Sequence, residues 1–166
     1  FCPPPPSSGW SGSSRRENGK EEKVEERKKE VGLTHLARRE AQAPLVAALI
    51  RRFAEVMGEE EALEVASEVI RADAVRSGAD LAEEYGGNSL DVLCRVVEEV
   101  WAQDGTMEMA NVRRTEDSLS FDVTRCGYAE MYRRLGLEEL GTTLSCQRDF
   151  AFNEGFNPTI GLERSQ

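Results

Sequence analysis

Residues 119–136 read LSFDVTRCGYAEMYRRLG, and the spacing of the apolar side chains changes at Cys126. Before this residue, Leu119, Phe121 and Val123 alternate with polar residues, as expected of a strand with one buried face. After it, apolar and aromatic residues recur at helical spacing until Gly136 ends the run. The stretch therefore predicts a strand that leads into a helix, with a cysteine at the junction.

The segments on both sides predict more helix than strand. Residues 107–114 precede the turn-rich residues 115–118 and are expected to form the first strand of an antiparallel hairpin. Helices are predicted at 44–57, 59–84, 89–103, 128–135 and 137–151, and a last strand at 159–164. This order defines an α+β fold, in which N-terminal helices pack with a small antiparallel sheet and two further helices.

The first predicted helix carries a row of large apolar residues. Its apolar face is therefore expected to point into the core, and it consists of Leu45, Leu49, Phe53 and Val56, joined by Ile50 and Met57. Pro44 suits the first turn of a helix, where its missing N–H has no partner to lose. We therefore expect the helix to begin at this proline.

The first 32 residues differ in composition from the rest. They combine four consecutive prolines, a Ser/Gly stretch and a run of mixed charges with almost no apolar residue. Such a segment cannot bury a core, so residues 1–32 are predicted to be disordered. Residues 33–166 have ordinary apolar content and are predicted to form one domain.

Charge and hydropathy narrow the class of partner. The net charge is −10, and all of it is carried by residues after position 43. An acidic domain repels phosphate backbones, which argues against nucleic acid as a partner. No apolar run is long enough to span a bilayer, and residues 1–14 lack the features of a signal peptide. We expect a cytoplasmic protein that acts on a small molecule and not at a membrane.

Three residues are the main candidates for chemistry. Cys126 is either a nucleophile or metal-binding thiolate at the strand-to-helix junction, or a small buried residue. Cys146 and Asp149 are three residues apart and share one helix face. With Cys126 they form either a partial metal site or a thiol beside a general base; alternatively, they are a core cysteine and a surface carboxylate. His35, the only histidine, is interpreted as incidental.

Several motifs in the C-terminal part resemble one known family. They are the strand that leads into Cys126, the Tyr/Leu-Gly helix after it, the pair Cys146 and Asp149, and Phe156-Asn157-Pro158 followed by Leu162-Glu163-Arg164. This pattern is similar to that of the L-2-amino-thiazoline-4-carboxylic acid hydrolase family. The resemblance implies opening of the ring of 2-amino-thiazoline-4-carboxylate to give N-carbamoyl-L-cysteine, a reaction of L-cysteine formation.

Hydrolysis at the ring's amidine carbon requires a base and a cation for the substrate carboxylate. Asp149 and Glu130 are the candidate bases. Arg125, Arg148 and Arg164 are the candidate cations, because guanidinium matches a carboxylate bidentately.

Two further residues are candidates for substrate binding. Tyr132 is also a candidate packing residue, and Asn157 is also a candidate turn residue. The sequence requires no cofactor, although a divalent metal is compatible with two cysteines and an aspartate.

Two other interpretations remain open. The domain is alternatively a non-catalytic small-molecule or metal-binding domain that uses the same pocket. Family members also continue past this point with a Cys-Asp-Phe segment, which would supply another strand. The chain is therefore alternatively expected to be an inactive truncated fragment that lacks this last strand.

Overall fold

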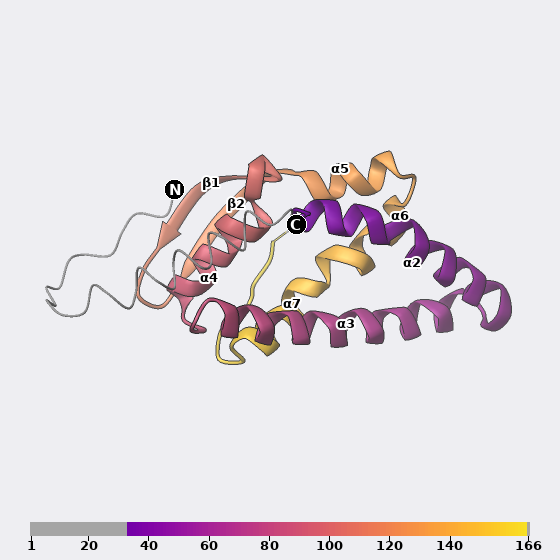
Figure 1. The fold of residues 1–166 in the computed structure, drawn as a ribbon, viewed down its shortest axis with the longest axis horizontal. Coiled ribbons are helices and arrows are strands. Elements are labelled where there is room, and N and C mark those ends of the chain that lie inside the picture. Colours follow the sequence, from indigo (N-terminus) through magenta and orange to yellow (C-terminus); the bar gives the residue numbers. More distant parts are fainter. Residues whose placement is uncertain (1–32, 166) are drawn as a thin grey trace, which may run out of the picture.

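Two long helices that run in opposite directions, α2 (His35–Met57) and α3 (Glu59–Glu84), follow each other in the chain, and α3 lies along the bottom of the view in Figure 1. The computed structural model describes residues 33–165, so the prediction for residues 1–32 lies outside the described residues. Gly58 joins the two helices with φ 100°, a conformation that favours glycine. The predicted bounds of α3 and the end of α2 are confirmed.

The helix α2 begins nine residues before the predicted start. Thr34 caps it, since the Thr34 hydroxyl accepts a hydrogen bond from the Ala37 amide at 3.1 Å. Pro44 lies inside the helix and not in its first turn, so that prediction was wrong. The extension adds two full turns, and these turns carry His35 and Arg39.

A short helical run connects α3 to the hairpin. It consists of α4 (Leu90–Val96), a π-helical turn η1 (Val97–Trp101) and a 3₁₀ turn η2 (Gln103–Gly105). The predicted antiparallel hairpin follows as β1 (Met107–Arg114) and β2 (Leu119–Cys126). Among residues 33–165, these two strands pair only with each other. The helices around this small sheet confirm the α+β fold class.

The C-terminal part of the chain forms shorter and more interrupted helices than predicted. After α5 (Gly127–Arg134), the expected helix 137–151 is split into α6 (Glu138–Gly141), the π-helical turn η3 (Thr142–Cys146) and α7 (Arg148–Phe156). The predicted strand at 159–164 is wrong, because these residues form a turn and irregular backbone. The Asn157 carboxamide starts that turn by accepting a hydrogen bond from the Thr159 amide at 3.0 Å.

The predicted buried face of α2 was also wrong, except at Ile50, which is buried. Leu45 is 66% exposed and Phe53 is 41% exposed, whereas Ala47, which was not predicted to face the core, is 1% exposed. α2 thus packs inward through small residues, which let neighbouring helices approach closely. One buried cluster joins α2 to α5, α6 and η3, and a second joins α4 to α7. The members are Ala43, Ala47, Ile50, Met131, Tyr132, Leu137, Leu140 and Leu144 in the first cluster, and Leu93, Val96, Phe152 and Phe156 in the second.

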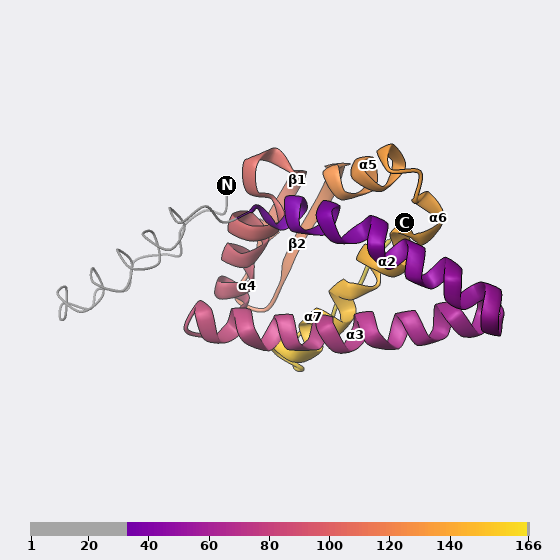
Figure 2. The same cartoon turned by 45° about the vertical axis from the view of Figure 1, so that its right-hand side comes forward.

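Helices α3 and α7 cross backbone to backbone. A Cβ on Gly78 would lie 2.2 Å from the Phe152 carbonyl oxygen, and one on Gly155 would lie 1.8 Å from the Val75 carbonyl oxygen. Figure 2 shows α7 lying against α3. Only glycine permits this approach, which fixes the position of α7 relative to α3.

The hydropathy of the described helices agrees with the absence of long apolar runs. Within residues 33–165, no helix combines the length and the apolar character needed to cross a bilayer.

Candidate active site

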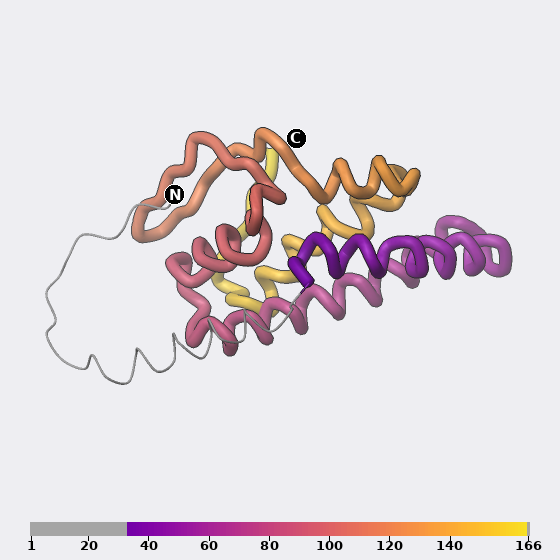
Figure 3. Tube along the Cα trace, turned by 45° about the horizontal axis from the view of Figure 1, so that its top comes forward, coloured from indigo at the N-terminus to yellow at the C-terminus, as the bar shows by residue number. Residues whose placement is uncertain are grey.

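An open cleft of about 2130 Å³ extends between the hairpin, the helices α3 and α7, and the first turns of α2. Cys126, Cys146 and Asp149, the three predicted catalytic residues, all line this cleft. The C-terminal segment, yellow in Figure 3, follows α7 and contributes Arg164. Cys146 comes from the turn η3, and residues of α4 and η1 also line the cleft, so the fold brings distant parts of the chain to one surface.

Cys126 is held where β2 becomes α5. The next residue, Gly127, donates its N–H to the Thr106 carbonyl at 2.7 Å. A Cβ on Gly127 would lie 2.6 Å from the same oxygen, so no larger residue fits without movement. The close approach fixes the junction, and the half-buried thiol of Cys126 is presented at the cleft.

Cys146 and Asp149 are tied together by Arg164. Its guanidinium donates to the Cys146 carbonyl at 3.2 Å and forms an ion pair with the Asp149 carboxylate. Burial raises the pKa of Asp149 above its usual range, and the charges of Arg164, Arg148 and Arg39 only partly oppose this. Burial likewise raises the pKa of the Cys146 thiol, again opposed by Arg164. Asp149 is therefore a stronger base than a fully solvated carboxylate.

Arg148 is anchored to α3. Its side chain is 9% exposed and pairs with Asp73 at 2.6 Å, with a further hydrogen bond to the Ile70 carbonyl at 3.4 Å. Arg148 lines the cleft, as a substrate-binding role requires. Its charge is nevertheless already matched by a carboxylate of the protein.

His35 and Tyr128 form a polar contact that the sequence did not predict. The His35 Nδ1 atom lies 2.8 Å from the Tyr128 hydroxyl, which is also 3.4 Å from the Trp101 carbonyl. Burial, with the charges of Arg39, Arg38 and Arg148, lowers the pKa of His35 to about 3. Burial also raises the pKa of Tyr128. Both side chains are therefore neutral near pH 7.

The sequence contains a pattern that indicates that His35 belongs to the first helix. His35, Arg39, Ala43 and Ala47 recur every fourth residue, which continues one helix face upstream of Pro44. Recognising that face would have extended the first predicted helix back to His35 and placed His35 and Arg39 on the same side of it as Ala43 and Ala47.

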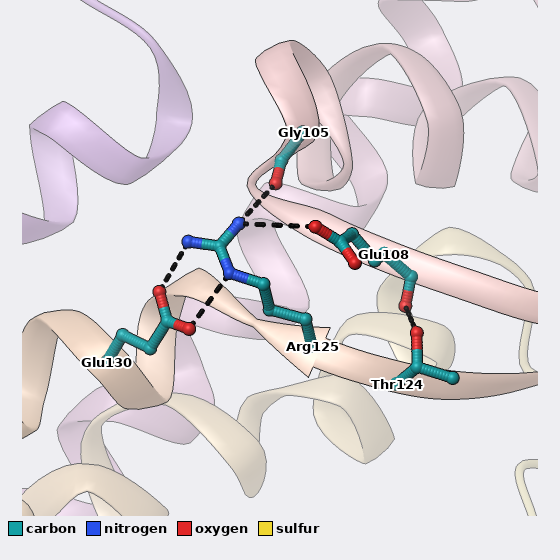
Figure 4. A network of polar contacts seen from close by, with 5 residues as sticks. All are labelled: Gly105, Glu108, Thr124, Arg125 and Glu130. Carbon is teal, nitrogen blue, oxygen red and sulfur yellow. Dashed lines mark hydrogen bonds and ion pairs between the residues drawn. The ribbon is translucent and has the colours of Figure 1, made fainter.

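Arg125 and Glu130 lie outside the cleft. The Arg125 guanidinium binds both carboxylate oxygens of Glu130, donates to the Gly105 carbonyl at 3.1 Å and lies 3.7 Å from Glu108 (Figure 4). This cluster lines a separate, smaller cavity beside α5. Of the two predicted bases, only Asp149 reaches the cleft.

The other two predicted substrate-binding residues have structural contacts. Tyr132 is buried in the first core cluster and is not among the residues that line the cleft. Asn157 lines the cleft, but its carboxamide donates to the Asn88 carbonyl at 2.9 Å and accepts from Thr159. Substrate roles for Tyr132 and Asn157 remain predictions.

The metal hypothesis finds little support in the geometry. In the part of the chain that the structure describes, no three His, Cys, Asp or Glu side chains are grouped so that they could hold a metal ion. Cys126, Cys146 and Asp149 therefore share a cleft without forming a three-ligand site.

Comparison with known proteins assigns the family. The model of L-2-amino-thiazoline-4-carboxylic acid hydrolase matches residues 38–166, which is most of the chain. The protein belongs to this family, whose name denotes hydrolase activity. No curated protein and no solved structure gives a significant match.

Proposed function

We propose that this protein opens the ring of L-2-amino-thiazoline-4-carboxylate by hydrolysis and forms N-carbamoyl-L-cysteine. In this reaction, one water adds its oxygen to the amidine carbon, the bond between that carbon and the ring sulfur breaks, and the sulfur leaves as a thiol. The product retains both nitrogens as a ureido group. The reaction would supply a precursor of L-cysteine.

The position of Asp149 carries the proposal. It is the candidate base that lines the cleft, its side chain is 34% exposed, and burial raises its pKa towards the working range of a general base. Two thiols, Cys126 and Cys146, line the same cleft. Family membership supplies the substrate to be tested.

The proposed roles follow from this arrangement. Asp149 takes one proton from the attacking water and returns it to the departing ring sulfur. The second proton of that water passes to the ring nitrogen, which becomes the N–H of the ureido group, so atoms and charge balance over the cycle. Arg164 holds the Asp149 carboxylate in place through their ion pair. Cys126 is either a packing residue at the cleft wall or a nucleophile that attacks the amidine carbon before water does.

Thiol release from 2-amino-thiazoline-4-carboxylate tests the reaction directly, because ring opening frees one thiol for each turnover. We expect Asp149→Asn to lower kcat at least 100-fold, the lower range for removal of a general base. Glu130→Gln is the matched control, since its carboxylate binds Arg125 outside the cleft. An equal loss of kcat in both variants would contradict the role of Asp149 as the general base.

Cys126→Ser separates the two mechanisms. Loss of all turnover, with folding retained, would assign covalent catalysis to Cys126. Turnover within about tenfold of the unmodified protein would leave water as the only nucleophile. Absence of thiol release by the unmodified protein would contradict the proposed function.

Binding without turnover is the second candidate function. The ion pair between Arg164 and Asp149 favours it, because a carboxylate engaged by guanidinium is less free to accept a proton. Calorimetric binding of the same compound by a protein that releases no thiol would support this alternative.

A further inference from the structure

The arginines that act on Asp149 are unequally matched by carboxylates. Three of them, Arg39, Arg148 and Arg164, lower its pKa through their charge. Arg148 pairs with Asp73, and Arg164 pairs with Asp149 itself. Arg39 has neither a hydrogen bond nor an ion pair among residues 33–165. Three guanidinium groups thus face two carboxylates, and one positive charge is left over.

The positive charge without a carboxylate partner, that of Arg39, is partly buried. Arg39 is half-buried on the second turn of α2 and lines the cleft. Burial and the nearby charge of Arg148 lower the pKa of Arg39, and the neighbouring Tyr128, Tyr132 and Asp73 oppose this only in part. A guanidinium nevertheless stays protonated near neutral pH. Holding such a charge without a partner costs free energy, and an anion bound beside it would recover that cost.

The excess positive charge is local, and its sign is opposite to that of the net charge of the whole chain. The chain carries a net charge of −10, yet this end of the cleft is positive. His35 adds no charge there at pH 7, because its imidazole is neutral. Long-range attraction by the whole protein would therefore not draw an anion to this cleft, and binding of an anion there would depend on the local arginines.

We propose that Arg39 binds the carboxylate of the substrate, and that the cleft accepts small ring compounds because they carry this group. The assignment rests on the function proposed above and adds its specificity residue. Guanidinium and carboxylate form two parallel hydrogen bonds, which fix orientation as well as position. Arg39 lies near enough to Asp149 and Tyr128 to shift the pKa of both, so a substrate held by its carboxylate would present its ring to Asp149.

The test compares two ligands and two variants by isothermal titration calorimetry. The ligands are 2-amino-thiazoline-4-carboxylate and its carboxamide, which has a similar size and no negative charge. In Arg39→Gln we expect affinity for the acid to fall roughly 30-fold or more, the lower range for one partner of a desolvated charge pair. Affinity for the carboxamide should change less than about threefold, because it makes no ion pair.

Arg76→Gln is the matched control. Arg76 is an exposed residue of α3 that does not line the cleft, and its replacement changes the net charge equally. We expect its affinity for the acid to stay within about threefold of the original, since an exposed charge is screened by solvent. The thermal midpoint of Arg39→Gln should be unchanged or higher, because the variant removes an unmatched charge. Equal loss in the two variants, equal loss for the two ligands, or unchanged binding of the acid by Arg39→Gln would overturn the proposal.

Thiol release is recorded in the same samples and separates this inference from the proposed function. If binding of the acid depends on Arg39 but no thiol is released, the proposed anion site is supported and the proposed hydrolysis is contradicted. If thiol is released and the KM of Arg39→Gln is unchanged, the proposed hydrolysis is supported and the proposed anion site is contradicted.

Discussion

The imidazole Nδ1 of His35 lies 2.8 Å from the phenolic oxygen of Tyr128, and this contact joins the first turn of α2 to α5. The folded protein lowers the pKa of His35 from 6.5 to about 3. Between these values the unfolded chain holds a proton that the folded chain does not. The stability from this group is therefore complete above pH 6.5 and is lost as the pH falls towards 3.

Replacing His35 by glutamine should flatten this pH dependence. Glutamine retains a hydrogen-bonding group but cannot take up the proton. We expect the free energy of unfolding of the original protein to fall with decreasing pH by up to about 1.4 kcal/mol per unit more than that of His35→Gln. Urea unfolding at pH 7, 6 and 5 measures the two slopes, and parallel slopes would refute the assignment.

Two arginine–carboxylate pairs connect α3 and α7 and should differ in strength. Arg148 is 9% exposed in its pair with Asp73, whereas Arg71 and Glu154 are 60% and 50% exposed. We expect Arg148→Met to lower the free energy of unfolding by about 1–3 kcal/mol, because a buried guanidinium loses its hydrogen bonds to Ile70 and to Asp73, which is itself 54% exposed. Arg71→Met should cost less than about 0.5 kcal/mol. Similar losses in denaturant unfolding would contradict this ranking.

The crossing of α3 and α7 should not tolerate a single added methyl group. Gly155→Ala places a carbon 1.8 Å from the Val75 carbonyl oxygen, so the helices must separate. We expect a loss of about 1–3 kcal/mol or more in chemical denaturation. Gly161→Ala is the control, since nothing lies within 4 Å of its added carbon. A loss for Gly161→Ala as large as that for Gly155→Ala would show that the crossing is not the cause.

Arg164 should control the reactivity of Cys146. Burial raises the pKa of this thiol and the Arg164 charge lowers it, so Arg164→Gln should raise it further. The rate of alkylation of Cys146 is measured as a function of pH by mass spectrometry of the peptide that contains it, and we expect the profile of the variant to shift to higher pH. The midpoint of this profile reports the pKa of the thiol and not simply its accessibility. Arg133→Gln, which removes an exposed charge paired with Glu138, should leave the profile in place.

The parts of the fold that could be predicted are those marked by local rules. Gly58 and the glycines at 86 and 87 delimit α3, and the alternation of apolar residues identifies β2. The inward face of α2 could not be read in this way, because large apolar residues are assumed to be buried. Here the neighbouring helices come too close for them, and Ala43 and Ala47 occupy the contact.

The same limits apply to the candidate site. Cys126, Cys146 and Asp149 were predicted from local motifs, and the structure brings all three to one cleft. Arg39, which also lines this cleft, was not a candidate because the helix was expected to begin at Pro44, although the proline lies within it. The misassigned strand at 159–164 has apolar residues at alternating positions, but within residues 33–165 it has no neighbouring strand with which to pair.

At the crossing of α3 and α7, the residues that fix the position of α7 differ from the residues that α7 presents to the cleft. Because Gly78 and Gly155 meet through their backbones, the position of the helix does not depend on side chains that interlock at that point. Asp149 lines the cleft and pairs with Arg164 rather than with α3, so this position can change while the crossing keeps the helix in place. Different side chains at such a position would change the chemistry of the cleft while the two glycines preserve the scaffold.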